Sequence, residues 1–305
     1  MIPANETFDG TFSFKPHFSN APGFRMHYVD EGKGDPVVCL HGEPTWGYVY
    51  RKFIPALSRH HRVVVPDHMG FGKSETPQDR EYTLSTHVKN LEAVLLDLDL
   101  RNITLVMQDW GGPIGGGFAL HHAARIKRLC FLNITAPLGL PIEEEIFPKN
   151  LQTPWFQWIK KANDDGTLEQ VLGNLGVTAL SVMKLLGFEN SAVFNDTCIR
   201  AYGAHFRTKE DCLGAINFPL DFLTGKWARF FAERGAGDVE AVRRKPAMLV
   251  EGLHDRAIFP DVVIAHVREA FPHAPIVELE QAGHFCQEDA PETVVALIEQ
   301  FLQLT

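Results

Sequence analysis

The chain lacks paired cysteines. Its 305 residues include only five, and no two of them form a Cys-x-x-Cys pair. A structural zinc site or a redox pair is therefore disfavoured. The odd number and scattered positions fit a reducing, cytoplasmic compartment better than a disulfide framework. The five residues are Cys39, Cys130, Cys198, Cys212 and Cys286.

Long apolar runs are also absent, and the N-terminus has no basic region followed by an apolar core. We therefore expect neither a membrane span nor a signal peptide. A net charge of -9 at pH 7 argues against non-specific nucleic-acid binding. The glycine-rich loop over 66–74 lacks the spacing of a phosphate-binding loop. The expected partner is a small molecule, bound by a monomer or a small homo-oligomer, with no nucleic acid and no membrane.

Short apolar runs of strand character alternate with segments of helical spacing along most of the chain. Strands are predicted over 25–30, 36–40, 62–65, 103–107, 128–134, 246–251 and 275–280. Helices are predicted over 48–58, 83–98, 113–124, 261–270 and 291–303. Strands that alternate with helices form a mostly parallel sheet flanked by helices, with right-handed crossovers.

The alternation stops between about residues 137 and 237. This stretch is mainly helical in character and holds three of the five tryptophans, which are Trp155, Trp158 and Trp227. We expect a helical cap domain over 137–237, inserted into an α/β core domain formed by 1–136 and 238–305.

The most informative stretch is Leu105–Gly112. A strand-like run ends at Asp109, and Gly111 and Gly112 open a small-residue segment of helical character. Strand, tight turn and helix in this order are the context of the nucleophile elbow of an α/β-hydrolase. The elbow usually carries Ser. Here the apex is Asp109, so a carboxylate would attack carbon and form an alkyl ester. A helix N-cap is the ordinary role of an isolated Asp.

A base and an acid follow in the chain order of that fold. His284 lies in the loop after the last predicted strand and would activate the water that hydrolyses the ester. Asp255, in the loop after the preceding predicted strand, is the predicted acid that orients His284. The other position for this acid holds Asn133, which cannot serve as an anion. Asp261 is the fallback, although its position is typical of a helix N-terminus.

The loop after the strand over 36–40 reads His41-Gly42-Glu43-Pro44-Thr45-Trp46. In α/β-hydrolases this loop supplies one backbone N–H group to the oxyanion hole, and the residue after the nucleophile supplies the other. The predicted donors are therefore the amides of Glu43 and Trp110.

Three motifs together resemble those of the haloalkane dehalogenases. They are the loop over 41–46, Gln108-Asp109-Trp110-Gly111-Gly112 and Ala282-Gly283-His284-Phe285. The resemblance covers most of the core and fades in the cap. It implies an α/β-hydrolase that converts a haloalkane to a primary alcohol, halide and a proton through a covalent alkyl-aspartate. It implies no metal or organic cofactor, and a role in detoxification.

The resemblance also implies how the halide ion is held. The indole N–H of Trp110 would donate to it, because indole is a donor without an acceptor and suits an anion in a dry pocket. Glu43 resembles the branch of the family that draws a second tryptophan from the cap, here Trp158 in preference to Trp155. Packing within the cap is the alternative role of both tryptophans. Ionised Glu43 cannot donate to halide, so its expected role is to orient groups or hold water.

Other functions on this fold have different requirements. An epoxide hydrolase needs acidic phenols from the cap, and Tyr202 is the only tyrosine over 137–237. A fluoroacetate-type dehalogenase carries Arg near the nucleophile, where this chain has Trp110, and a serine esterase needs Ser at the elbow. A catalytically silent ligand receptor often loses a triad member, whereas this chain retains three candidates. Asp109→Asn separates the classes, since ligand binding would survive in a receptor while turnover would fail in an enzyme.

Overall fold

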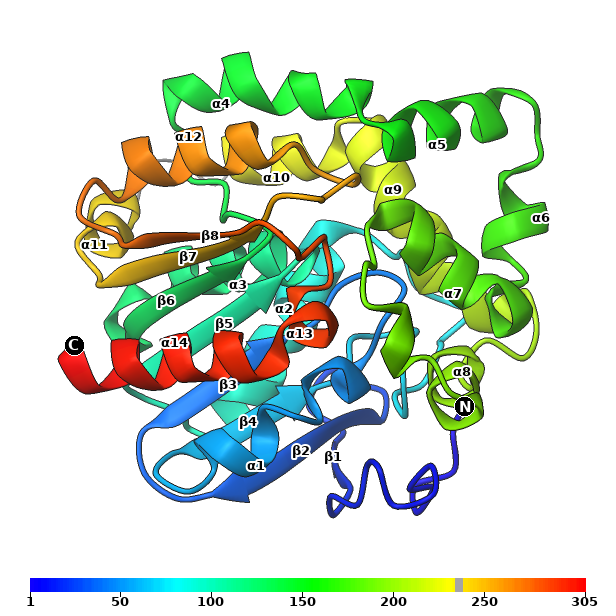
Figure 1. The fold of residues 1–305 in the computed structure, drawn as a ribbon, viewed down its shortest axis with the longest axis horizontal. Helices are drawn as coiled ribbons and strands as arrows, with labels where there is room; N and C mark the ends of the chain where they lie inside the picture. The colour runs from blue at the N-terminus through cyan, green and yellow to red at the C-terminus, as the bar shows by residue number, and fades with distance from the viewer. Residues whose placement is uncertain (234–237) are drawn as a thin grey trace.

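A computed structural model describes residues 1–233 and 238–305. Within these ranges, eight strands form one sheet in the order β1-β2-β4-β3-β5-β6-β7-β8 (Figure 1). Their bounds are β1 (His17–Ser19), β2 (Met26–Gly32), β3 (Pro36–Leu40), β4 (Arg62–Pro66), β5 (Ile103–Gln108), β6 (Ile126–Leu132), β7 (Ala247–Gly252) and β8 (Ile276–Leu279).

The pairs β1–β2 and β2–β4 of the sheet are antiparallel, and all pairs from β4 to β8 in the sheet order are parallel. β3 and β5 lie at its centre and are buried along their whole length. Strands buried on both faces read as continuous apolar runs, which is why the sequence pattern located them. The predicted mostly parallel sheet is confirmed.

Helices cover both faces of the sheet. In Figure 1, α1 and α14 lie in front of the strands, and α2 and α3 lie behind them. The helices outside the insertion are η1 (Gly47–Tyr50), α1 (Ile54–Leu57), α2 (Leu84–Asp97), α3 (Gly111–His121), η2 (Ala123–Arg125), α12 (Pro260–Ala270), α13 (Cys286–Asp289) and α14 (Pro291–Leu304).

One predicted helix is broken. The continuous helix expected over 48–58 is a 3₁₀ turn, η1, followed by the separate short helix α1. Pro55 lies in the first turn of α1. Proline has no backbone N–H and fits the start of a helix, so a new helix begins here rather than one running through.

In the stretch between β6 and β7, all regular elements that the structure describes are helices, joined by loops. Its elements are α4 (Pro141–Ile146), η3 (Phe147–Gln152), α5 (Pro154–Asp164), α6 (Leu168–Leu172), α7 (Leu175–Leu186), η4 (Ser191–Val193), α8 (Asp196–Gly203), η5 (Glu210–Cys212), α9 (Leu213–Leu223), α10 (Lys226–Glu233) and α11 (Val239–Arg243). We call this stretch the insertion. The predicted boundary at residue 237 falls at 234–237, outside the described residues.

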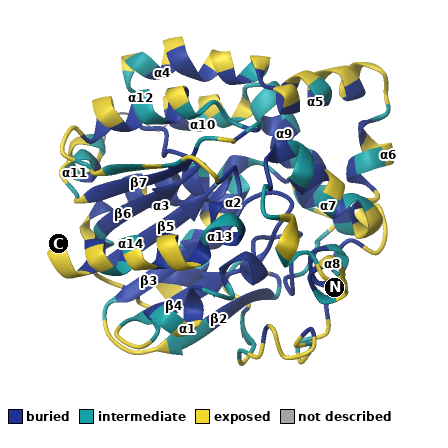
Figure 2. Ribbon diagram, in the orientation of Figure 1, coloured by how far each residue is buried: buried dark blue, intermediate teal, exposed yellow. Residues whose placement is uncertain are grey.

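The insertion and the sheet share one hydrophobic core. Figure 2 shows the central strands buried and the outward faces of α4, α5 and α14 exposed. Polar contacts add to the packing, since the Trp46 indole donates to the Ala201 carbonyl at 2.9 Å and Arg256 donates to the Lys184 carbonyl at 2.7 Å. No helix in the described ranges is both long and apolar enough to cross a membrane.

Candidate active site

Asp109 occupies the turn between β5 and α3 with φ of 49°, in the left-handed region that few non-glycine residues adopt. Its side chain does not cap α3, whose N-cap is Trp110 and has no side-chain cap bond. Instead, Asp109 Oδ1 accepts a hydrogen bond from the backbone N–H of Glu43 at 2.7 Å. The turn therefore holds the carboxyl away from the helix, as predicted for a nucleophile elbow.

Two glycines allow the chain to come this close. A Cβ at Gly42 would overlap the Asp109 carboxyl, and a Cβ at Gly111 would overlap the backbone carbonyl of Leu40. The loop after β3 and the start of α3 can therefore meet at Asp109 only because both positions lack a side chain.

His284 and Asp255 lie together as the sequence order predicted. The His284 Nδ1 and Asp255 Oδ2 atoms are 2.8 Å apart, and both side chains are buried. The other ring nitrogen, Nε2, lies 3.4 Å from Asp109 Oδ2, a charge contact without the alignment of a hydrogen bond. The remaining oxygen of Asp255 accepts N–H bonds from Ala257 at 2.8 Å and Ile258 at 3.0 Å. The acid is thus fixed on both oxygens.

The charges around His284 set its protonation. Burial by itself lowers the pKa of this imidazole, but the carboxylates of Asp255 and Asp109 outweigh burial and raise the pKa to about 10. Near neutral pH His284 is therefore an imidazolium held between two carboxylates.

Asn133, which cannot serve as the anionic acid, lies beside the acid loop and bonds to it. Its Nδ2 donates to Asp255 Oδ2 at 3.1 Å and to the Gly252 carbonyl at 3.0 Å, and its Oδ1 accepts the Gly252 N–H at 3.1 Å. Glu251 lies behind it, and burial followed by the charge of Asp255 raises the pKa of Glu251 well above its usual range. These surroundings favour the neutral form of Glu251 over the charged form.

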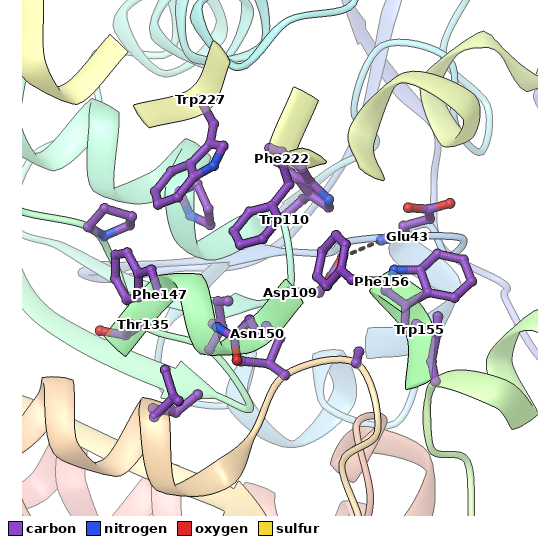
Figure 3. A pocket seen from close by; sticks show the side chains of 18 residues that line it. Glu43, Asp109, Trp110, Thr135, Phe147, Asn150, Trp155, Phe156, Phe222 and Trp227 are labelled. Atoms are coloured by element: carbon purple, nitrogen blue, oxygen red, sulfur yellow. Dashed lines mark hydrogen bonds between the residues drawn. The ribbon is translucent and has the colours of Figure 1, made fainter. Parts of the chain in front are cut away.

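Asp109 opens onto a largely apolar cavity beneath the insertion (Figure 3). The wall combines loops at the ends of the strands with helices of the insertion. Its lining residues are Glu43, Asp109, Trp110, Pro113, Ile134, Thr135, Pro137, Phe147, Asn150, Trp155, Phe156, Leu186, Phe222, Trp227, Ala257, Ile258, Val262 and Val263.

The two tryptophans of α5 that were expected as halide donors differ in position. Trp155 lines the cavity, whereas Trp158 is half-buried, does not line it and packs on Trp155 with ring centroids 5.3 Å apart. Both are on α5, and a step of three residues turns a side chain about 60° around the helix axis. Trp227, from α10, is a third tryptophan of the insertion and also lines the cavity.

The indole N–H groups of Trp110 and Trp155 have no acceptor among residues 1–233 and 238–305. Trp46 differs, since its indole bonds to the Ala201 carbonyl. The indole of Trp227 has no acceptor in these ranges either, so three unused indole donors lie in the wall that also holds Asp109. Of the two predicted oxyanion donors, the Glu43 amide is bonded to Asp109, and the Trp110 amide makes no bond to that carboxyl in this structure.

Two residues considered from the sequence lie elsewhere. Asp261 is exposed in the first turn of α12. Tyr202 is buried on α8 with its hydroxyl on Glu288, and does not line the cavity. Across the described ranges, no three His, Cys, Asp or Glu side chains gather as metal ligands would.

Comparisons with known proteins place this geometry in a family. The alpha/beta hydrolase fold model matches residues 35–291. The chain is 33% identical over 303 residues to cis-3-alkyl-4-alkyloxetan-2-one decarboxylase of Shewanella oneidensis, covering 97% of this chain and 91% of the relative. It is 33% identical over 302 residues to haloalkane dehalogenase of Psychrobacter cryohalolentis, covering 95% and 93%.

The chain is also similar, over most of its length, to a solved structure of a haloalkane dehalogenase. Haloalkane dehalogenase DpaA from Paraglaciecola agarilytica, described as tetrameric, matches with a TM-score of 0.75 and 29% identity, covering 96% of this chain and 93% of that one. The chain belongs to the alpha/beta hydrolase fold family and has haloalkane dehalogenases among its homologues.

Proposed function

We propose that the protein is a haloalkane dehalogenase, which hydrolyses a carbon–halogen bond of a haloalkane to an alcohol, halide and a proton. One observation carries the proposal. The Asp109 carboxylate shares an apolar cavity with three indole N–H groups, of Trp110, Trp155 and Trp227, that have no acceptor among the described residues. Such donors suit a leaving anion in a water-poor site.

In the first step, Asp109 Oδ2 attacks the carbon that bears the halogen. The new carbon–oxygen bond is an ester, and the halide leaves with the electron pair of the broken bond. Oδ1 stays on the Glu43 amide as the ester carbonyl oxygen. Trp110 and Trp155 donate hydrogen bonds to the departing halide, so Trp155 takes the role expected of Trp158.

In the second step, His284 activates water against the ester. Esterification removes the negative charge of Asp109, which is one of the charges that raise the pKa of His284. The imidazolium therefore loses its proton more readily in the intermediate and becomes a base. Asp255 holds Nδ1, so that Nε2 faces the ester. His284 takes a proton from the water that adds to the ester carbonyl and returns it to the departing alkoxide, while the Glu43 amide supports the oxyanion. The alcohol leaves, and the Asp109 carboxylate is restored with release of one proton.

The insertion has the role of a cap in this proposal. Trp155, Phe156, Phe222 and Trp227 reach the cavity from α5, α9 and α10. These large apolar side chains exclude water, which strengthens the interaction of the indole donors with the halide. We propose the domain division predicted from the sequence, with 137–237 as the cap over a core of 1–136 and 238–305.

The first test is halide release from 1,2-dibromoethane and 1-bromobutane, with Asp109→Ala as the control. Release by the wild-type protein alone supports the proposal. His284→Phe should then trap the alkyl-aspartate, seen as a mass increase of the intact protein by the alkyl group. Folded wild-type protein that releases no halide from either substrate contradicts the proposal.

A second candidate function is the decarboxylation of an oxetan-2-one. Two relatives named for this activity are 33% identical to this chain, and the matches cover 97% and 96% of it. Attack by Asp109 on C4, the alkyl-bearing carbon bonded to the ring oxygen, is also a displacement by a carboxylate, in which the C4–O bond breaks and frees the carboxylate of the lactone. Loss of CO₂ from that carboxylate would then form a carbon–carbon double bond and expel the Asp109 carboxylate, leaving an alkene. Release of CO₂ from a cis-3,4-dialkyl oxetan-2-one, without halide release from haloalkanes, would favour this candidate.

Two other functions are tested in the same series. Styrene oxide is the probe for an epoxide hydrolase, although Tyr202 is not in the cavity to supply an acidic phenol. Ligand binding without turnover of haloalkane, lactone or epoxide would favour a silent receptor.

A further inference from the structure

Glu251 is a buried carboxyl behind the triad that the proposed mechanism does not use. It lies near the end of β7, just before the loop that holds Asp255, and its side chain is fully buried. Oε1 lies 3.3 Å from Asn133 Nδ2, and Oε2 is buried without a hydrogen-bond partner among the described residues. An ionised carboxylate with so few donors is strongly destabilised in a protein interior, which favours the neutral acid at this position.

The Asn133 amide links this carboxyl to the acid of the triad. Its Nδ2 has two hydrogens and three acceptors, which are Gly252 O at 3.0 Å, Asp255 Oδ2 at 3.1 Å and Glu251 Oε1 at 3.3 Å. Asp255 Oδ2 is also the oxygen that lies 2.8 Å from His284 Nδ1. A continuous series of polar contacts therefore runs from the Glu251 carboxyl to the His284 ring.

The two carboxyls that share this amide differ in their other donors. Asp255 also accepts the backbone N–H groups of Ala257 and Ile258, at 2.8 and 3.0 Å, and it lies against the His284 ring. Glu251 has none of these contacts. Because two negative charges that share one site repel each other, the charge stays on the carboxyl that has more donors.

The other titratable groups around Glu251 do not reverse this assignment. Burial has the largest effect on the pKa of Glu251 and raises it, as do the charges of Asp255 and of Glu278, its neighbour on β8. The charge of His284 opposes these effects only in part. The buried thiol of Cys286 on α13 has a pKa well above its usual range and stays neutral. Of the two carboxyls that share the amide, Asp255 is therefore the anion and Glu251 the neutral acid.

We propose that Glu251 is a positioning residue of the triad, whose carboxyl oxygen accepts the Asn133 amide and so holds that amide against Asp255. The inference rests on the proposed function. A neutral Glu251 holds the amide without placing a second negative charge beside Asp255. A second carboxylate there would raise the pKa of His284 further and keep its ring protonated when the ester must be hydrolysed. Displacement by Asp109 does not use His284 as a base, so Glu251 acts on the hydrolysis step.

The decisive comparison is between Glu251→Gln and Glu251→Met. Glutamine stays neutral and keeps an oxygen that accepts the Asn133 amide, whereas methionine keeps the length and has no such acceptor. Val250→Ala, on the same strand, is the control for lost stability, because its buried side chain is apolar. The readouts are kcat for 1-bromobutane and the fraction of alkyl-enzyme at steady state, measured by mass spectrometry of the intact protein.

We expect Glu251→Gln to keep the kcat of the wild type, and Glu251→Met to lower kcat about 10- to 100-fold, the loss typical of a misplaced catalytic group. The alkyl-enzyme should accumulate in Glu251→Met, because only the step that needs His284 is slowed. Val250→Ala should lose stability without accumulating the intermediate. A wild-type kcat in Glu251→Met, or accumulation in Val250→Ala as well, would overturn the positioning role.

Two NMR measurements test the inference without turnover. Glu251→Gln should leave the pKa of His284 at about 10, because the substitution removes no charge. Glu251→Met should shift the side-chain amide signals of Asn133. A lower His284 pKa in Glu251→Gln, or unchanged Asn133 signals in Glu251→Met, would overturn the inference. Halide release by the wild type tests the proposed function separately, so failure of one proposal is distinguishable from failure of the other.

Discussion

Asp109 and Asp255 are both carboxylates beside His284, and their surroundings give them different tasks. Asp255 has four hydrogen-bonded contacts, from His284, Asn133, Ala257 and Ile258. Asp109 has one, from the Glu43 amide, and retains an oxygen without a hydrogen bond. A fully satisfied acid positions its partner, whereas a partly satisfied one is free to attack.

At the residue scale, the pKa of His284 reports the charge of Asp109. Asp109→Asn removes a negative charge that raises the pKa of the imidazole, so the pKa should fall from about 10. The measurement is a histidine NMR titration of the wild type and the variant. An unchanged His284 pKa would contradict both the assigned charge contact and the way His284 becomes a base in the intermediate.

Asp255→Asn should lower kcat by about 10³- to 10⁴-fold, the loss known when the orienting acid of a triad becomes an amide. The amide no longer holds His284 with Nε2 free to act as base. Because the displacement step needs only Asp109, the alkyl-enzyme should accumulate and be visible by mass spectrometry.

Asp261→Asn is the matched control, since Asp261 is exposed on α12 and is expected to leave kcat unchanged. A comparable loss in both variants would remove Asp255 from its assigned role.

Element α5 carries two tryptophans of which only one faces the cavity. Trp155→Phe keeps an aromatic ring and removes the indole N–H, so bromide should bind about 10- to 100-fold more weakly if that donor holds the anion. Trp158→Phe should change bromide affinity little, because Trp158 packs on Trp155 and does not line the cavity. Inhibition by bromide measures both, and the reverse order would restore Trp158 as the donor.

For the whole molecule, buried polar contacts join the insertion to the core. Glu288 on α13 is fully buried. Its carboxylate accepts hydrogen bonds from Tyr202, on α8 of the insertion, and from Arg51 of the core. Loss of one donor leaves a buried carboxylate oxygen with fewer hydrogen bonds, which typically lowers the free energy of unfolding by about 1–3 kcal/mol. The insertion and the core should therefore unfold together.

Tyr202→Phe is expected to lower the free energy of unfolding by about 1–3 kcal/mol, measured by urea denaturation, with a single transition. Tyr28→Phe is the control, because no residue of the described ranges bonds to the Tyr28 hydroxyl. Two separate transitions, or equal stability of both variants, would contradict this account of how the insertion is held.

Much of the fold follows from local patterns. The apolar runs at β3 and β5 predict buried strands, because a strand covered on both faces has no polar face. Asp109 followed by glycines predicts the elbow, because the tight turn leaves little room for side chains. The chain order of Asp109, Asp255 and His284 predicts their meeting, since the ends of parallel strands lie at one edge of the sheet. These rules depend on neighbours in sequence or on topology alone.

Other features depend on distance and burial between segments far apart in the chain. Helical spacing alone did not decide which of Trp155 and Trp158 faces the cavity, because that depends on how α5 is rotated against the core. The charge of Glu43 depends on the hydrogen bonds and the dielectric around its carboxyl, and Asn133 joins the acid loop across more than a hundred residues. The sequence by itself therefore determined the sheet, the elbow and the candidate triad, while only the tertiary structure decided which side chains line the cavity, because packing exists only in the folded chain.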